Sequence, residues 1–265
     1  MKKNGIKAEW RTVLTAAAAV LLLVSLVAGS CALVELIDRN NAYTEGDKSY
    51  EAIKAAAVRE SGGIDEPDAR QAGKPRDGLD VSVDFGALER ISEDASAWLF
   101  CPGTVIDYPV MKADDYSYYL HHLPDGSYNV NGALFIDYNC ASDFSGPLTV
   151  IYGHHMKSGK MFGTLVGYKK QDYYEAHPEM YLYTKNKNYR IELLYGCVIG
   201  AGEWRAKGYM YQQNLNNLLS YAKTHTTFKS AAKAAEDNRY VVLLTCTYEF
   251  DDARYIVIGL LEPLP

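Results

Sequence analysis

Apolar residues in this chain follow two different patterns. Near the amino terminus an almost uncharged stretch, 13–34, covers about 22 residues, and at about 1.5 Å per residue a helix of that length crosses a hydrocarbon core of roughly 30 Å. Beyond residue 130, the apolar residues instead form short runs rich in Val, Ile, Leu and Tyr. The pattern therefore predicts a membrane helix followed by a mainly β domain.

The density of these short strands favours a closed or nearly closed β-barrel with peripheral helices. Helical patterns occur at 85–95, 163–171 and 215–225. The last of these could equally be an amphipathic helix that covers the core or a wall of a substrate groove. The predicted strands are 133–137, 148–152, 180–184, 189–199, 240–245 and 254–261.

Basic residues precede the amino-terminal apolar stretch. Lys2, Lys3, Lys7 and Arg11 lie before it, so the positive-inside rule predicts that the amino terminus stays in the cytoplasm and that the following residues lie outside. A cleaved signal peptide is the alternative, which the length of the apolar stretch disfavours. We therefore expect a single-pass plasma membrane protein.

Composition divides the segment that follows the apolar stretch into two parts. Residues 35–60 are rich in Ala, Glu and Lys and could continue as a helix, whereas 61–78 carry Gly and Pro among charges, which is typical of a flexible linker. The boundary of the globular domain is expected near Leu79. The predicted organisation is a cytoplasmic tail at 1–11, a transmembrane signal anchor at 12–34, an extracellular tether at 35–78 and a catalytic domain at 79–265.

The segment 241–261 carries the candidate chemistry. Two apolar runs flank a short polar turn, with Cys246 at one edge and Arg254 at the other, which predicts a hairpin that presents a thiol beside a positive charge. A thiolate attacks carbonyl carbon, a guanidinium can hold the resulting oxyanion, and His154 supplies a candidate base. Taken one at a time, a buried apolar cysteine and an edge arginine are the more common interpretations.

Charge and cysteine content limit which partners and cofactors we expect for this chain. A net charge of −6 over 265 residues argues against a nucleic-acid partner, and the sequence has no Gly-rich phosphate loop. Of five cysteines, Cys31 lies in the membrane stretch, while Cys101, Cys140 and Cys197 are expected to be buried apolar residues. Cys246 must stay free for the proposed chemistry. No His/Cys ligand cluster is present, so we expect neither a metal nor a cofactor.

Several blocks together resemble a known family. Leu244-Thr245-Cys246, followed by Arg254 and an apolar strand, resembles the signature of sortases, the membrane-bound cysteine transpeptidases of Gram-positive bacteria. Tyr116 and Leu244 depart from the common pattern, in which Asn and a small hydroxyl residue are frequent. The blocks that follow the order of class B sortases are 98–99, 103–110, Asp115, 119–120, 132–137, 152–156 and 161–162.

The resemblance implies roles for individual residues. Cys246 would be the nucleophile, Arg254 would stabilise the oxyanion, and His154, rather than its neighbour His155, would transfer protons. A backbone N–H next to Cys246 is expected to add an oxyanion donor. The residues implied to line the groove for the sorting peptide are Leu120, Tyr152 and Thr245.

The resemblance also implies partners. The substrates would be surface proteins with a carboxy-terminal sorting signal of the Asn-Pro-x-Thr kind or a close variant, and the acceptor would be an amine of peptidoglycan or of its lipid-linked precursor. A pilin-polymerising sortase and a membrane-tethered interaction module without activity are the alternatives. In a plain cysteine protease, water rather than an amine would resolve the thioester.

Overall fold

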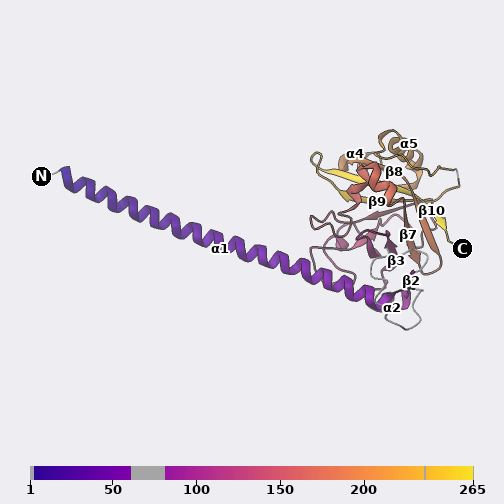
Figure 1. Ribbon diagram of the computed structural model, residues 1–265, viewed down its shortest axis with the longest axis horizontal. Helices are drawn as coiled ribbons and strands as arrows, with labels where there is room; N and C mark the ends of the chain where they lie inside the picture. Colours follow the sequence, from indigo (N-terminus) through magenta and orange to yellow (C-terminus); the bar gives the residue numbers. More distant parts are fainter. Residues whose placement is uncertain (1–2, 61–80, 236, 265) are drawn as a thin grey trace. The chain divides into compact units, whose positions relative to one another are not determined.

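The computed structural model describes residues 3–60, 81–235 and 237–264 (Figure 1). The predicted linker at 61–78 and the predicted boundary at Leu79 lie outside these residues. The chain divides into two compact units, Met1–Glu45 and Gly46–Pro265. Residues 46–57, which were expected to belong to the tether, are therefore part of the same unit as the β domain.

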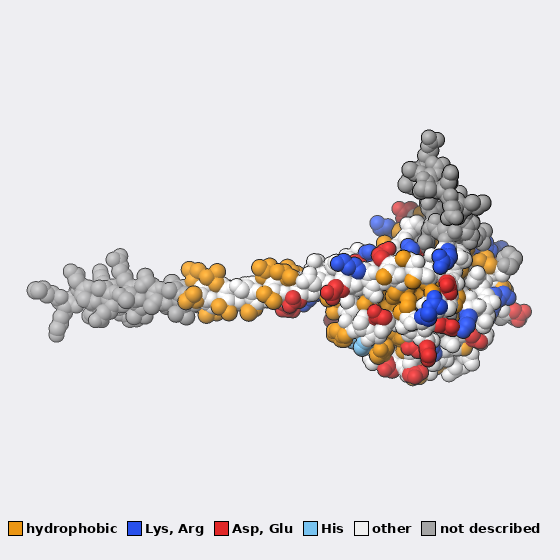
Figure 2. Space-filling view, turned by 90° about the horizontal axis from the view of Figure 1, so that it is seen from below, with side chains coloured by type: hydrophobic (Ala, Val, Ile, Leu, Met, Phe, Trp, Pro, Cys, Tyr) orange, Lys and Arg blue, Asp and Glu red, His pale blue; other side chains and the backbone are white. Residues whose placement is uncertain are grey.

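The first helix, α1, runs from Lys3 to Ala57 without a break. Its described apolar portion is long and apolar enough to cross a membrane by length and composition, a test that a signal sequence also passes. Apolar side chains are exposed along this portion (Figure 2), as expected of a surface that meets lipid rather than protein. The helix continues past residue 35 because Ala, Glu and Lys are good helix formers.

Eight strands close into a barrel in the order β10-β8-β7-β3-β4-β5-β6-β9. All neighbouring pairs are antiparallel except β4 with β5 and β6 with β9, which are parallel. The strands are β3 (Ala95–Phe100), β4 (Asp107–Lys112), β5 (Leu134–Ile136), β6 (Leu148–Tyr152), β7 (Glu179–Thr184), β8 (Asn188–Gly200), β9 (Tyr240–Cys246) and β10 (Ala253–Pro263).

Short helices surround the barrel, and α4 and α5 both contact β8 (Figure 1). Two short strands, β1 (Val58–Glu60) and β2 (Val81–Val83), pair outside the barrel. The helices are α2 (Phe85–Ile91), α3 (Gln171–Ala176), α4 (Ala201–Ala206) and α5 (Leu215–His225), with 3-10 turns η2 (Tyr118–Leu120), η3 (Leu165–Lys169) and η4 (Gln212–Asn214).

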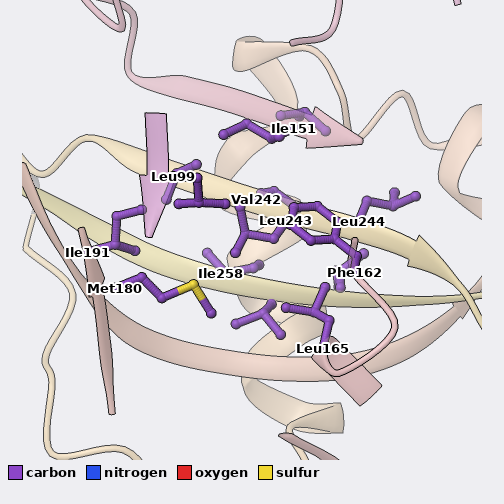
Figure 3. Packing of buried hydrophobic residues seen from close by; sticks show 14 of the residues in the cluster. Leu99, Ile151, Phe162, Leu165, Met180, Ile191, Val242, Leu243, Leu244 and Ile258 are labelled. Atoms are coloured by element: carbon purple, nitrogen blue, oxygen red, sulfur yellow. The ribbon is translucent and has the colours of Figure 1, made fainter. Parts of the chain in front are cut away.

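The barrel encloses the main hydrophobic core. Side chains from separate strands, among them Leu99, Met180 and Leu243, meet in its interior with Phe162 and Leu165 from the connection after β6 (Figure 3). Burial of this many aliphatic and aromatic side chains is the dominant stabilising term for the domain.

A second apolar cluster lies between the carboxyl end of α1 and β3. Ile53 and Ala57 of α1 are buried there against Leu88 and Trp98. An ion pair between Lys54 and Asp107 lies at the same junction. The end of α1 is thus packed against the barrel, and it forms part of the domain's own core.

The barrel prediction is confirmed, and the predicted strand at 148–152 and helix at 215–225 have the expected bounds. Helix α5 buries Leu218 and Ala222 in the core and does not line the candidate site, so the core-covering interpretation of this helix is the correct one. The predicted helix at 163–171 is shorter, a 3-10 turn at Leu165–Lys169.

Candidate active site

The β9–β10 hairpin places the thiol and the guanidinium opposite each other. In the antiparallel register, Cys246 at the end of β9 pairs directly with Arg254 near the start of β10. Cys246 is half-buried, and its sulfur is free. Long apolar runs on both sides of the polar turn fix this register, because a slip by one residue would turn the buried face of each strand outward.

His154 reaches the same end of the barrel from the neighbouring strand. β6 runs parallel to β9, and the contact continues beyond the strand, where the Gly153 N–H donates to the Leu244 carbonyl at 3.1 Å. The Thr245 hydroxyl donates to the Gly153 carbonyl at 2.8 Å. Because Gly153 is tied to β9 at both its N–H and its carbonyl, the next residue, His154, lies beside Cys246.

Gly153 is required for this close approach. A Cβ placed there would lie 2.4 Å from Leu134 Cδ2 and 2.5 Å from Phe162 Cδ2, well inside contact distance. Any larger residue would have to displace the side chains of Leu134 and Phe162 or shift the backbone that carries His154.

The imidazole of His154 is oriented by one hydrogen bond. Nε2 lies 2.7 Å from the Leu120 carbonyl oxygen. A carbonyl can only accept, so Nε2 carries a proton, and in the neutral ring Nδ1 is the atom with a free lone pair. Nδ1 is therefore the ring atom of His154 that is able to take up a proton from a neighbouring group.

His155 has a different role. Its Nδ1 lies 2.7 Å from the backbone carbonyl of Cys246, and its ring packs against Tyr248. Unlike His154, His155 does not line the cavity described next. Its contact instead fixes the backbone of the residue that carries the thiol.

A cavity of about 610 Å³ lies over these residues. The three proposed catalytic residues line it, and so do Leu120, Tyr152 and Thr245, the predicted substrate-contacting residues. Thr245 is almost fully buried, so it forms part of the cavity wall and exposes almost no surface to a ligand. The other lining residues are Tyr116, Phe135, Tyr138, Gly153, Ala201, Trp204, Arg205, Met210, Tyr211 and Leu244.

One wall of the cavity is held by a buried carboxylate. Oδ2 of Asp137, which is fully buried, accepts hydrogen bonds from the hydroxyls of Tyr152 at 2.6 Å and Tyr116 at 3.0 Å. Oδ1 accepts from the backbone N–H and the side-chain amide of Asn139. Burial, and next the charge of Asp137, raise the pKa of both tyrosines well above the usual value. These hydroxyls therefore remain protonated donors.

Arg254 has N–H donors that could bind a ligand. In the described part of the chain its polar partners are the Ala253 carbonyl, 3.0 Å from Nη1, and the exposed Asp252 carboxylate, 3.9 Å from Nη2. A guanidinium carries five N–H donors, and an ion pair as exposed as this one is weak. The group can thus hydrogen-bond an oxyanion without losing a strong contact.

The expected backbone donor next to Cys246 is not available on its carboxyl side. The N–H of Thr247 donates to the Ala253 carbonyl at 3.0 Å, as the hairpin geometry requires. The prediction overlooked that this amide closes the hairpin. Of the groups that line the cavity, Arg254 is the one placed across from the thiol to bind an oxyanion.

Sequence reasoning missed the wall formed by 201–211. Trp204 and Arg205 of α4 line the cavity, as do Met210 and Tyr211 after it. This segment has no regular apolar period, and only the combination of one tryptophan with two tyrosines could have drawn attention to it. Of the two interpretations left open for 215–225, the substrate wall does not apply to that helix, and the wall is formed by 201–211 instead.

The remaining cysteines behave as predicted. Cys101, Cys140 and Cys197 are buried and unpaired with one another. Burial raises the pKa of the Cys101 thiol to about 11 and that of Cys197 to about 12. Within the described residues, no group of three or more His, Cys, Asp or Glu side chains could hold a metal ion.

Comparison with known proteins shows what this chain is similar to. No protein-family model matches the chain. The Sortase B of Listeria monocytogenes serovar 1/2a is 29% identical over 188 residues, which cover 68% of this chain and 74% of the relative. The chain is a homologue of the class B sortases. The resemblance seen in the sequence, and with it the assignment to this cysteine transpeptidase family, is therefore confirmed.

Solved structures agree with the sortase fold. A class B sortase of Streptococcus pyogenes involved in pilus biogenesis aligns with a TM-score of 0.60 at 28% identity, over 67% of this chain and 97% of that one. A Bacillus anthracis protein described as similar to sortase B aligns with a TM-score of 0.68 at 22% identity, over 84% and 98%. The barrel of this chain is thus a sortase-type barrel.

Proposed function

We propose that this protein cleaves a carboxy-terminal sorting signal through a thioester on Cys246 and transfers the acyl group to an amine. The observation that carries the proposal is the pairing of Cys246 with Arg254 across the hairpin, at a cavity that His154 also lines. Nucleophile, proton carrier and oxyanion donor are the three groups that acyl transfer requires.

In the first half-reaction, Cys246 gives its proton to Nδ1 of His154 and its sulfur attacks the carbonyl carbon of the scissile peptide bond. The new oxyanion accepts hydrogen bonds from Arg254. The C–N bond then breaks, and His154 donates the proton to the leaving amine. The sorting signal's carboxy-terminal part departs, and a thioester remains.

In the second half-reaction, the amine of the acceptor attacks the thioester carbon and loses a proton to His154. The C–S bond breaks, an amide forms, and the thiolate of Cys246 leaves. A sortase B has been solved in complex with triglycine, and that of Staphylococcus aureus in complex with substrate. For this chain we propose a sorting signal of the Asn-Pro-x-Thr kind, and a glycine-type or other peptidoglycan amine as the acceptor.

The location follows from the amino terminus. We propose that α1 keeps the protein in the plasma membrane with the barrel on the extracellular side, because basic residues precede the apolar stretch. The substrate would then be an exported surface protein, and the acceptor would lie in the cell wall or on its lipid-linked precursor. The cytoplasmic tail at 1–11 is part of this proposal.

Pilin polymerisation is the second candidate. The Streptococcus pyogenes relative that is 28% identical is described as involved in pilus biogenesis. A polymerising enzyme would use a lysine side chain of a second pilin as the acceptor. The two candidates share both half-reactions up to the thioester and differ only in the amine that resolves it.

The test uses the full chain in detergent micelles with fluorogenic peptides that carry Asn-Pro-x-Thr variants. Each peptide is incubated with triglycine, with a diamino acid, with a lysine-containing peptide or with no amine, and the products are identified by mass spectrometry. The expected result is an amide-linked product that disappears in Cys246→Ala. Cleavage that yields only free acid with every amine would refute the transpeptidase, and no Cys246-dependent cleavage at all would favour a module without activity.

A further inference from the structure

The carboxyl end of α1 contacts both segments that hold the proposed catalytic histidine. This contact is made by Tyr50, which is 6% exposed. Its hydroxyl donates a hydrogen bond to the Gly132 carbonyl, and its ring packs edge-on against Tyr108 with centroids 5.1 Å apart. Each of these two partners leads to His154 by a separate route.

The first route passes through Gly132. This residue has φ +56°, and a Cβ placed there would lie 3.0 Å from His154 Cδ2 and 2.8 Å from the Leu120 carbonyl oxygen. The backbone at Gly132 therefore lies close to the imidazole and to the carbonyl that orients it, with no room for a side chain between them. Movement of Gly132 would change the position of both.

The second route passes through Tyr108. Its hydroxyl accepts from the Met161 N–H at 3.2 Å, and Met161 forms an antiparallel bridge with His155. The N–H of Phe162 in turn donates to the His154 carbonyl at 3.0 Å. This route holds the backbone on the carboxyl side of the imidazole, at the His154 carbonyl and at His155.

The sequence of α1 fits this close contact. Gly46, one turn before Tyr50, lies against the same loop, and a Cβ there would be 2.3 Å from Asn131 Nδ2. Glycine in the interior of a helix costs roughly 1 kcal/mol relative to alanine, so its presence at the point of closest approach indicates that packing against the loop outweighs helix propensity.

We propose that Tyr50 is a positioning residue for His154, so that the helix that carries the membrane anchor also completes the active site. The proposal rests on the role of His154 proposed above. The hydroxyl of Tyr50 holds Gly132, Gly132 and the Leu120 carbonyl hold the imidazole, and Nδ1 is thereby kept directed toward the thiol. Loss of the hydroxyl would leave the imidazole in place on average but less well oriented.

The experiment compares Tyr50→Phe with Lys54→Gln in the full chain in micelles. Tyr50→Phe keeps the ring contact and removes the hydrogen bond to Gly132. Lys54→Gln is the matched control, because it removes a contact of the same helix with Asp107 of β4 and leaves the hydrogen bond between Tyr50 and Gly132 in place. Each variant is measured for kcat, KM and thermal midpoint, and the side-chain nitrogens of His154 are followed by NMR with [15N]histidine labelling.

For Tyr50→Phe we expect kcat to fall by about tenfold with KM changed less than about twofold, as when an interaction that acts in the transition state is lost. The His154 nitrogen signals should shift, and the midpoint should stay within about 4 °C of wild type. Lys54→Gln should leave kcat and the His154 signals unchanged. Gly46→Ala, which pushes α1 away from the loop, should reproduce the effect and replaces Tyr50→Phe if that variant fails to fold.

Unchanged kcat and His154 signals in folded Tyr50→Phe would overturn the proposal. An equal fall of kcat in Tyr50→Phe and Lys54→Gln, in step with their thermal midpoints, would also overturn it, because the helix would then only stabilise the domain. If the wild type turns over no peptide, the proposed function fails, yet the NMR comparison still decides whether Tyr50 orients the imidazole.

Discussion

Replacing Asp137 with asparagine tests whether a buried carboxylate holds the cavity wall. Oδ2 accepts from the hydroxyls of Tyr152 and Tyr116, and Oδ1 accepts twice from Asn139. An asparagine keeps one acceptor oxygen and puts an NH₂ donor where the other oxygen was. With the amide oxygen toward Asn139, the NH₂ can donate to the two tyrosine oxygens, so the four contacts can persist, but each of them loses its charged acceptor.

The expected cost follows from these contacts. A hydrogen bond to a charged group contributes about 1.5–3 kcal/mol and a neutral one about 0.5–1.5 kcal/mol, so four bonds that lose the charge weaken by about 4 kcal/mol together. The expected cost is somewhat smaller, because Tyr116 is 40% exposed and water can replace its partner. We therefore expect Asp137→Asn to lower the free energy of unfolding by about 3 kcal/mol, and to raise KM for the peptide because Tyr152 and Tyr116 line the cavity.

The measurement is urea unfolding of the full chain in micelles, followed by tryptophan fluorescence, beside peptide kinetics. Asp125→Asn is the matched control, since that carboxylate accepts from the residue two positions on, Ser127, as Asp137 does from Asn139, but is exposed. We expect a change within about 0.5 kcal/mol. A loss below about 1 kcal/mol in Asp137→Asn, with KM unchanged, would refute the reasoning that this carboxylate organises the wall.

Three further predictions concern the site and the core. Gly153→Ala should lower the free energy of unfolding by about 1–3 kcal/mol and abolish turnover, measured by urea unfolding and peptide cleavage, because its Cβ would overlap two apolar side chains. Iodoacetamide at about pH 8 should modify Cys246 and leave Cys101 and Cys197 unmodified, as mapped by mass spectrometry. Burial shields these two thiols from the reagent and raises their pKa values to about 11 and about 12. Labelling of Cys101 or Cys197 in the folded protein would contradict their burial. Burial also raises the pKa of Tyr108 to about 12, so the unfolded chain releases the Tyr108 proton near pH 10, before the folded chain does. The free energy of unfolding should therefore fall as the pH rises from about 10 to about 12. A urea midpoint that stays constant over that range would contradict this prediction.

Much of the barrel could be predicted because its strands are apolar runs separated by polar turns. The strand at Leu148–Tyr152 and the pairing of Cys246 with Arg254 follow from that pattern alone. Strands β3 and β4 were expected only through the resemblance, since their residues show no clear alternation.

The docking of α1 on the domain was not predicted, although the sequence contains a signal for it. Tyr50, Ile53 and Ala57 are spaced by three and four residues and form one buried stripe on the helix. The composition of 35–60 shows that a helix forms but not which face is buried, and the tether prediction weighed composition alone. The position of the 201–211 wall could not be predicted, because it depends on how a long connection folds over the end of β8.

The parallel pairing of β6 with β9 has a consequence for when the protein becomes reactive. The imidazole and the thiol are brought together only when β9, which enters the barrel about ninety residues after β6, is in place, with Thr245 bonded to Gly153 across a separation of 92 residues. A chain that is still being synthesised lacks this pairing, because contacts of such long range form late. A chain that ends before β9 therefore has the imidazole without the thiol, and nascent or truncated molecules cannot carry out the proposed acylation before the barrel has closed.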